Sequence, residues 1–99
     1  MIYIYINRDR YGHIENFKVL GHSDYAEEGE DIVCAAVSAI VQTAVMGIGN
    51  VAKIDSKYSQ EKGYASLSLP HNLSSEQIRD AHMILETMYI GLKSIELQY

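Results

Sequence analysis

Residues 21–38 read Gly21-His22-Ser23-Asp24-Tyr25-Ala26-Glu27-Glu28-Gly29-Glu30-Asp31-Ile32-Val33-Cys34-Ala35-Ala36-Val37-Ser38. This segment begins where a predicted strand ends, continues through a polar, acidic stretch and enters the longest apolar stretch of the chain. It contains the only cysteine, Cys34, twelve positions after His22. The first turn of a helix leaves backbone N–H groups without partners, so a thiol placed there is favoured as thiolate, the nucleophilic form.

Two interpretations of Cys34 follow from the sequence. A histidine within reach of the thiol completes a catalytic pair, which favours His22 as the partner of Cys34. Alternatively, Cys34 is a small core residue, because cysteine is among the most buried residue types and its neighbours are mostly Ala, Val and Ile. The acidic loop between His22 and Cys34, bounded by glycines, favours catalysis because it is more typical of a mobile lid than of a packed core.

Upstream of this segment the pattern predicts two strands. Ile2-Tyr3-Ile4-Tyr5-Ile6 alternates strictly, which predicts a strand with isoleucines on one face and tyrosines on the other. A turn is expected over residues 7–12. A second strand is expected over residues 13–20, with Phe17 and Val19 sharing one face, and it ends at Gly21 and His22.

Downstream, apolar residues at helical spacing predict a helix over residues 31–47, which Gly47 and Gly49 end. Strands are expected over 51–58 and 63–69, joined by a turn at residues 59–62, and Pro70 ends the second. Ser74 and Gln77 have capping-box spacing ahead of a second amphipathic helix. The order ββαββα with short hairpin links predicts an α+β domain, a largely antiparallel sheet covered by two helices.

Composition limits the function classes. The chain has 99 residues, 47% hydrophobic content and a net charge of -5, which fits a single domain over residues 1–99 with a modest core. No basic stripe is present, so direct nucleic-acid binding is not expected. One cysteine and no export signal favour the cytoplasm. The stretch from Ile32 to Ile48 is interrupted by polar residues and is shorter than the roughly 20 residues of a membrane span, so no membrane association is expected.

Two residues at helical spacing from Cys34 are candidates to support a catalytic pair. Asp31 lies about one turn before Cys34 and Ser38 about one turn after it, so either is placed to orient an imidazole or the helix terminus. The predicted lid comprises Ser23, Asp24, Tyr25, Ala26, Glu27, Glu28 and Gly29. Its carboxylates disfavour a thiolate nearby and attract a cationic substrate. No second ligand at metal spacing accompanies His13, His71 or His82, so neither a metal site nor a cofactor is expected.

The run Gly21-His22 followed by residues 29–38 resembles the signature of the ribosomal-processing cysteine protease family, Prp, and the likeness covers nearly the whole chain. The resemblance implies an endopeptidase that removes the N-terminal extension of ribosomal protein L27. It implies His22 as general base and Cys34 as nucleophile, with Gly21, Asp31 and Ser38 in support. It further implies a flexible loop over the site, an apolar substrate groove and a homodimer.

The resemblance leaves three points open. Family members often continue into a further short strand, so residues 94–99 either pair with the sheet or fray. No pattern shows which residues line the groove. The alternative function is a noncatalytic ribosome-associated assembly factor in which Cys34 only packs, and the reactivity of the native thiol separates it from the protease.

Overall fold

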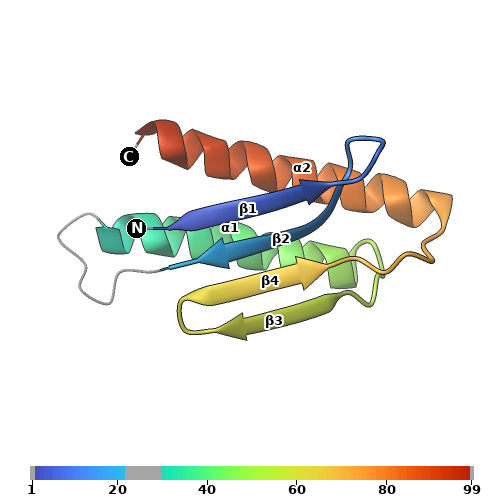
Figure 1. Ribbon diagram of the computed structural model, residues 1–99, viewed down its shortest axis with the longest axis horizontal. Helices are drawn as coiled ribbons and strands as arrows, with labels where there is room; N and C mark the ends of the chain where they lie inside the picture. The colour runs from blue at the N-terminus through green and yellow to red at the C-terminus, as the bar shows by residue number, and fades with distance from the viewer. Residues whose placement is uncertain (1, 22–29, 99) are drawn as a thin grey trace.

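A computed structural model describes residues 2–21 and 30–98 and shows two layers, a four-stranded sheet and two helices behind it (Figure 1). The elements are β1 (Tyr3–Arg8), β2 (Ile14–Leu20), α1 (Glu30–Asn50), β3 (Lys57–Glu61), β4 (Tyr64–Ser68) and α2 (Ser75–Gln98). The strand order is β1-β2-β4-β3, and every neighbouring pair is antiparallel. The predicted α+β class and the order ββαββα are therefore confirmed.

The alternation of side chains along the strands separates the two faces of the sheet. Ile6 pairs with Phe17, and Phe17 pairs with Leu67, so these side chains share the face toward the helices. Phe17 and Leu67 are almost completely buried. Tyr3 and Tyr5 remain more than half exposed on the other face, as the alternation predicts.

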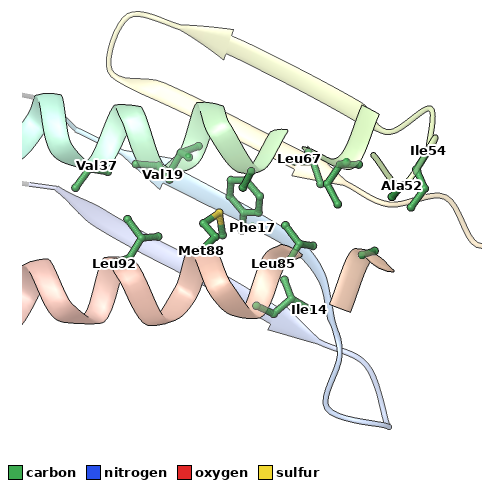
Figure 2. Close-up of a cluster of buried hydrophobic side chains, with 14 residues drawn as sticks. Ile14, Phe17, Val19, Val37, Ala52, Ile54, Leu67, Leu85, Met88 and Leu92 are labelled. Carbon is green, nitrogen blue, oxygen red and sulfur yellow. The ribbon is translucent and has the colours of Figure 1, made fainter. Parts of the chain in front are cut away.

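The core lies between the sheet and the two helices. Figure 2 shows Phe17 and Leu67 of the sheet among side chains of both helices, with Met88 and Leu92 contributed by α2. In α2 the buried residues follow steps of three and four positions: Ala81, Leu85, Met88 and Leu92. This spacing confirms the predicted amphipathic helix, although Ile78, expected on the same stripe, is 42% exposed.

The two helices run antiparallel and approach closely at two glycines. A Cβ atom on Gly47 would lie 3.4 Å from Ile84, and one on Gly91 would lie 3.3 Å from Ile40. Gly47 therefore allows the two helices to pack closely and lies inside α1. The prediction that Gly47 ends the helix is wrong. The helix continues to Asn50 because Ile48, fully buried, extends the apolar face by another turn. The N–H groups of Val51 and Ala52 then both bond to the Gly47 carbonyl.

The second hairpin also differs from the prediction. Residues 51–56 form no strand, although Ala52 and Ile54 are buried, because this segment closes the end of α1: the Ile54 N–H bonds to the Ile48 carbonyl. The strand begins at Lys57 and includes the predicted turn residues Ser59 to Glu61. The turn is at Lys62 and Gly63, where Gly63 takes φ 75, a conformation that favours glycine.

The C-terminal residues belong to α2, which continues to Gln98. Residues 94–98 therefore do not pair with the sheet. An ion pair between Arg8 and Glu86 joins the end of β1 to this helix, and the Arg8 guanidinium also lies 5.3 Å from the centre of the Tyr89 ring.

Helix α1 is long and apolar enough to cross a membrane, judged by length and composition alone. Its stretch Ile32–Asn50 has a mean hydropathy of 2.0, and 22% of that stretch is buried inside the fold. The expectation that this apolar stretch is too short to span a membrane is therefore wrong, because the helix continues past Gly47 and Gly49 to Asn50. One face of the helix lies in the core through Val37, Val41, Ala44 and Ile48.

The capping box at the start of α2 is confirmed. The Gln77 N–H donates to Ser74 Oγ, and the Ser74 N–H donates to Gln77 Oε1, each at 3.1 Å. Gln77 also donates from Nε2 to the carbonyl of Lys53 at 3.0 Å, which ties the α1–β3 connection to α2.

Replacing Ser74 with alanine should lower the free energy of unfolding by about 1 kcal/mol, because one N–H group at the helix start loses its acceptor. Urea unfolding followed by circular dichroism measures the change. Ser75→Ala is the matched control, and an equal loss in both variants would contradict the role of Ser74 as the cap.

Candidate active site

Cys34 lies near the start of α1, at the end of the molecule where β2 also ends (Figure 1). The helix begins at Glu30, so Cys34 is its fifth residue and lies just beyond the first turn, where the unpaired N–H groups are. This is one position deeper than the sequence predicts. The unpaired N–H groups that an oxyanion needs therefore lie in the first turn of α1, at residues 30–32, and not at Cys34 itself.

The burial of Cys34 bears on its two interpretations. The side chain is half-buried and is absent from the cluster of buried core residues. The core-facing residues of this part of the helix are instead Val37 and Val41. A half-buried thiol is accessible to substrate in a way that a core cysteine is not, which favours the catalytic interpretation.

Gly21 directly follows β2 and has a defined conformation. It takes φ 91, and its N–H donates to the carbonyl of Gly63 in the β3–β4 turn at 2.8 Å. A side chain at this position would be strained, since L-residues disfavour positive φ. The hydrogen bond fixes the chain immediately before position 22, at the end of the sheet where α1 begins (Figure 1).

The remaining predicted site residues divide into two groups. Ser38 is exposed on α1, one turn beyond Cys34, as the spacing predicts. Asp31 lies in the first turn of α1, and its side chain is outside the described part of the structure. His22 and the predicted lid, Ser23 to Gly29, also lie outside the described residues. Their predicted roles stay predictions.

A small crevice, not predicted from the sequence, opens between α1 and β3 beside Ser38. We call it the α1–β3 crevice; its volume is about 50 Å³. Four apolar side chains form its floor: Val19, Val37, Val41 and Ala65. Four polar residues form its rim: Ser38, Gln42, Tyr58 and Gln60. The crevice could have been predicted only from the register of the second hairpin. This register pairs Tyr58 with Leu67 and Gln60 with Ala65, so that both side chains of β3 face the helices.

Tyr58 and Gln60 are linked within the rim. The Tyr58 hydroxyl donates to Gln60 Oε1 at 3.0 Å. A tyrosine hydroxyl is protonated at neutral pH, and burial raises the pKa of the Tyr58 hydroxyl further, so it acts as a donor. With Oε1 engaged by Tyr58, the Gln60 amide nitrogen is the donor that this side chain presents to a ligand.

The other histidines lie away from Cys34. The rings of His13 and His82 approach with centroids 4.4 Å apart, next to the β1–β2 turn, and His71 lines the same pocket of about 390 Å³. Within residues 2–21 and 30–98 no group of three or more His, Cys, Asp or Glu side chains is arranged to hold a metal ion.

Comparison with known proteins places this arrangement in a family. The sequence profile described as Cysteine protease Prp matches residues 1–99. The ribosomal processing cysteine protease Prp of Bacillus subtilis is 33% identical over 101 aligned positions, covering 100% of this chain and 90% of that protein. The protein of the same name from Staphylococcus aureus is 31% identical, covering 100% and 92%.

Solved structures agree with the sequence comparison. The essential ribosomal processing protease Prp from S. aureus in complex with a substrate peptide has a TM-score of 0.86 and 27% identity, covering 100% of this chain and 92% of that one. The same protease with a covalently linked product peptide has a TM-score of 0.83 and 29% identity, with the same coverage. The chain described here therefore belongs to the Prp family and is a cysteine protease.

Proposed function

We propose that this protein removes the N-terminal extension of ribosomal protein L27, using Cys34 as nucleophile and His22 as general base. The observation that carries the proposal is the accessible thiol near the start of α1, at the end of the sheet where the chain continues from Gly21 to His22. The relatives are named ribosomal processing proteases, and one is solved with a substrate peptide, which supports a ribosomal protein substrate. The noncatalytic assembly factor is set aside because the chain belongs to a protease family.

The proposed chemistry is acyl transfer through the thiol. His22 takes the Cys34 proton, and the thiolate sulfur attacks the scissile carbonyl carbon. The backbone N–H groups at the start of α1 stabilise the resulting oxyanion, and the leaving amine takes the proton from His22. Water then hydrolyses the thioester and restores the thiol. Gly21 positions His22 in this scheme, and Asp31 and Ser38 orient the imidazole or the helix terminus.

The substrate is tested by comparing L27 precursor with mature L27 under identical conditions. We expect the precursor to be shortened to the mature length and the mature protein to remain intact, with both followed by gel electrophoresis. Shortening of unrelated ribosomal proteins at the same rate would contradict L27 as the specific substrate. The cytoplasm, where ribosomal proteins are made, is the proposed location.

We also propose that the protein works as a homodimer, with the outer surface of the two helices at the interface. A groove of about 670 Å³ runs between α1 and α2 and is lined by Ile40, Met83 and Ile84 among others. Met46, Met83 and Ile90 on these helices are each more than half exposed. Apolar surface of this kind is typical of an interface.

Replacing Met83 with glutamate should convert the dimer to a monomer, because the carboxylate would be buried without a partner at the interface. Sedimentation at micromolar concentration should give twice the 11.1 kDa chain mass for the wild type and the single chain mass for the variant. Ser68→Glu adds the same charge to the sheet face away from the helices and should leave the dimer intact. A wild-type protein that sediments as a monomer would contradict the proposal.

A further inference from the structure

A second pocket lies at the opposite end of the sheet from Cys34, where the β1–β2 turn meets the first turns of α2 (Figure 1). We call it the turn pocket; its volume is about 390 Å³, within the range of roughly 300–1,000 Å³ typical of ligand pockets. Ile14 lines it at the start of β2, and the seven residues of this strand span about 20 Å toward the end where Cys34 lies. The turn pocket is therefore too far from Cys34 to hold the residues next to the scissile bond.

Two carboxylates, Asp9 and Glu15, line the turn pocket, and its described lining contains no lysine or arginine. Asp9 Oδ1 accepts backbone N–H bonds from Tyr11 at 2.8 Å and from His13 at 3.0 Å, which fixes the carboxyl group and leaves Oδ2 for a ligand. Desolvation alone would raise the pKa of Asp9, but the two N–H groups outweigh it and hold the pKa below its ordinary value. Within residues 2–21 and 30–98 the Glu15 carboxylate forms no ion pair. The pocket therefore presents negative charge to a ligand.

The arginines near the turn leave this charge available. Arg8 is engaged by Glu86 and by the carbonyl of Gly12, and it does not line the pocket. Arg10 is exposed, lies 6.0 Å from the centre of the Tyr11 ring and is also outside the lining. A ligand in the pocket therefore meets the two carboxylates before it meets a fixed positive charge.

The rest of the wall supplies apolar surface and one polar atom without a partner. Ile78 is 42% exposed although it belongs to the apolar stripe of α2, because it borders this open pocket. His82, whose ring contacts that of His13, has a buried Nδ1 that is the one buried side-chain nitrogen or oxygen without a hydrogen bond in the described part of the chain. Buried polar atoms in native proteins are nearly always hydrogen-bonded, so an exception beside a pocket is a reason to expect a ligand there.

This lining fits a long basic side chain. Lysine and arginine carry an apolar stem and a cationic head, so the stem can cover the wall at Ile78 while the head reaches Asp9 and Glu15. An acidic side chain would be repelled, and an apolar one would desolvate the carboxylates without giving them a partner. Proteins that bind RNA neutralise its phosphates with lysine and arginine, so the part of a ribosomal protein that enters the ribosome is a source of such side chains.

We propose that the turn pocket is an exosite, a binding site away from the catalytic centre, that holds a lysine or arginine from the part of L27 precursor that remains after cleavage. An extended chain advances about 3.3 Å per residue, so this side chain lies about six or more residues from the scissile bond. The inference rests on the proposed function, because it takes L27 precursor as the substrate. The exosite binds the precursor and takes no part in bond cleavage, so it acts on KM and leaves kcat unchanged.

Removing the two charges tests the exosite. Asp9→Asn keeps an acceptor for the two backbone N–H groups, and Glu15→Gln keeps the size of its side chain. The substrates are whole L27 precursor and a synthetic peptide with four residues on either side of the bond, which reaches about 13 Å from it and cannot contact the pocket. At pH 8, where an imidazole of ordinary pKa is uncharged, the double variant should raise KM for the precursor at least fivefold and leave KM for the peptide unchanged. An unchanged KM for the precursor would overturn the exosite.

The matched control removes the same two charges elsewhere. Asp55→Asn combined with Glu61→Gln changes net charge equally, and both residues are exposed and outside the turn pocket. This control should leave KM for both substrates unchanged. An equal rise in KM for the precursor in both double variants would show a general attraction between an acidic enzyme and a basic substrate, and it would overturn the exosite.

A third variant separates the pocket from the surface around it. Ile78→Trp fills the turn pocket without changing charge, so it should also raise KM for the precursor at least fivefold and leave KM for the peptide and the melting temperature unchanged. If the charge variant raises KM and Ile78→Trp does not, the carboxylates act outside the pocket and the exosite is wrong.

The two substrates also distinguish the failure of each proposal. If the wild type cleaves neither the peptide nor the precursor, the proposed function fails. If it cleaves both and the variants keep the wild-type KM for the precursor, only the exosite fails. Should the Asp9→Asn and Glu15→Gln double variant not fold, Glu15→Gln alone is measured, because its carboxylate has no ion pair to lose within the described residues. It should raise KM for the precursor at least twofold, and an unchanged KM would overturn the exosite.

Discussion

Replacing Cys34 with alanine should reduce kcat for cleavage of L27 precursor by at least roughly three orders of magnitude. Alanine removes the nucleophile and leaves no side-chain group that can form a thioester. Because Cys34 is half-buried and outside the core cluster, the free energy of unfolding should change by no more than about 1 kcal/mol. Steady-state cleavage measures the first effect and urea unfolding the second.

Cys34→Ser is the conservative companion variant. Its hydroxyl is a much weaker nucleophile than a thiolate, so it should be nearly as inactive as the alanine variant while preserving size. Substantial turnover by either variant would contradict the assignment of Cys34. Loss of activity accompanied by loss of the folded state would point instead to a structural role.

Replacing His22 with alanine should lower kcat by about 10²- to 10⁴-fold, the range expected when a general base is removed. The same variant should slow alkylation of Cys34 in the native protein at neutral pH, because the thiol loses the group that takes its proton. His71→Ala is the matched control, since His71 is exposed and belongs to a pocket that Cys34 does not line. Retained cleavage by the His22 variant would refute the proposed dyad.

Secondary structure was predictable wherever the local pattern matched the final packing. The alternation in residues 2–6 and the spacing of Ala81, Leu85, Met88 and Leu92 each describe one face against the core, and the structure confirms both. The end of α1 was not predictable from the residues around Gly47. The low helix propensity of glycine predicts that the helix ends there, whereas the structure places Gly47 inside the helix, where it allows close contact with Ile84, a residue 37 positions away in the sequence.

The candidate site was likewise predictable only where its residues belong to one helix. Cys34 and Ser38 belong to one helix, so their shared face follows from spacing alone. The α1–β3 crevice depends on the register between β3 and β4 and on which sheet edge α1 lies beside, and neither is encoded locally. The sequence predicts a turn at residues 59–62, whereas residues 59–61 belong to β3. Because Gln60 was predicted to lie in the turn, the sequence did not indicate on which face of the sheet its side chain lies.

The central claim, that Cys34 cleaves the L27 precursor, is tested most directly by the masses of the products. Precursor incubated with the wild-type protein should give two fragments whose masses sum to that of the precursor plus one water, one fragment being the N-terminal extension. The Cys34→Ala variant should leave the precursor mass unchanged. An intact precursor after incubation with wild type, or the same two fragments with the alanine variant, would contradict the claim.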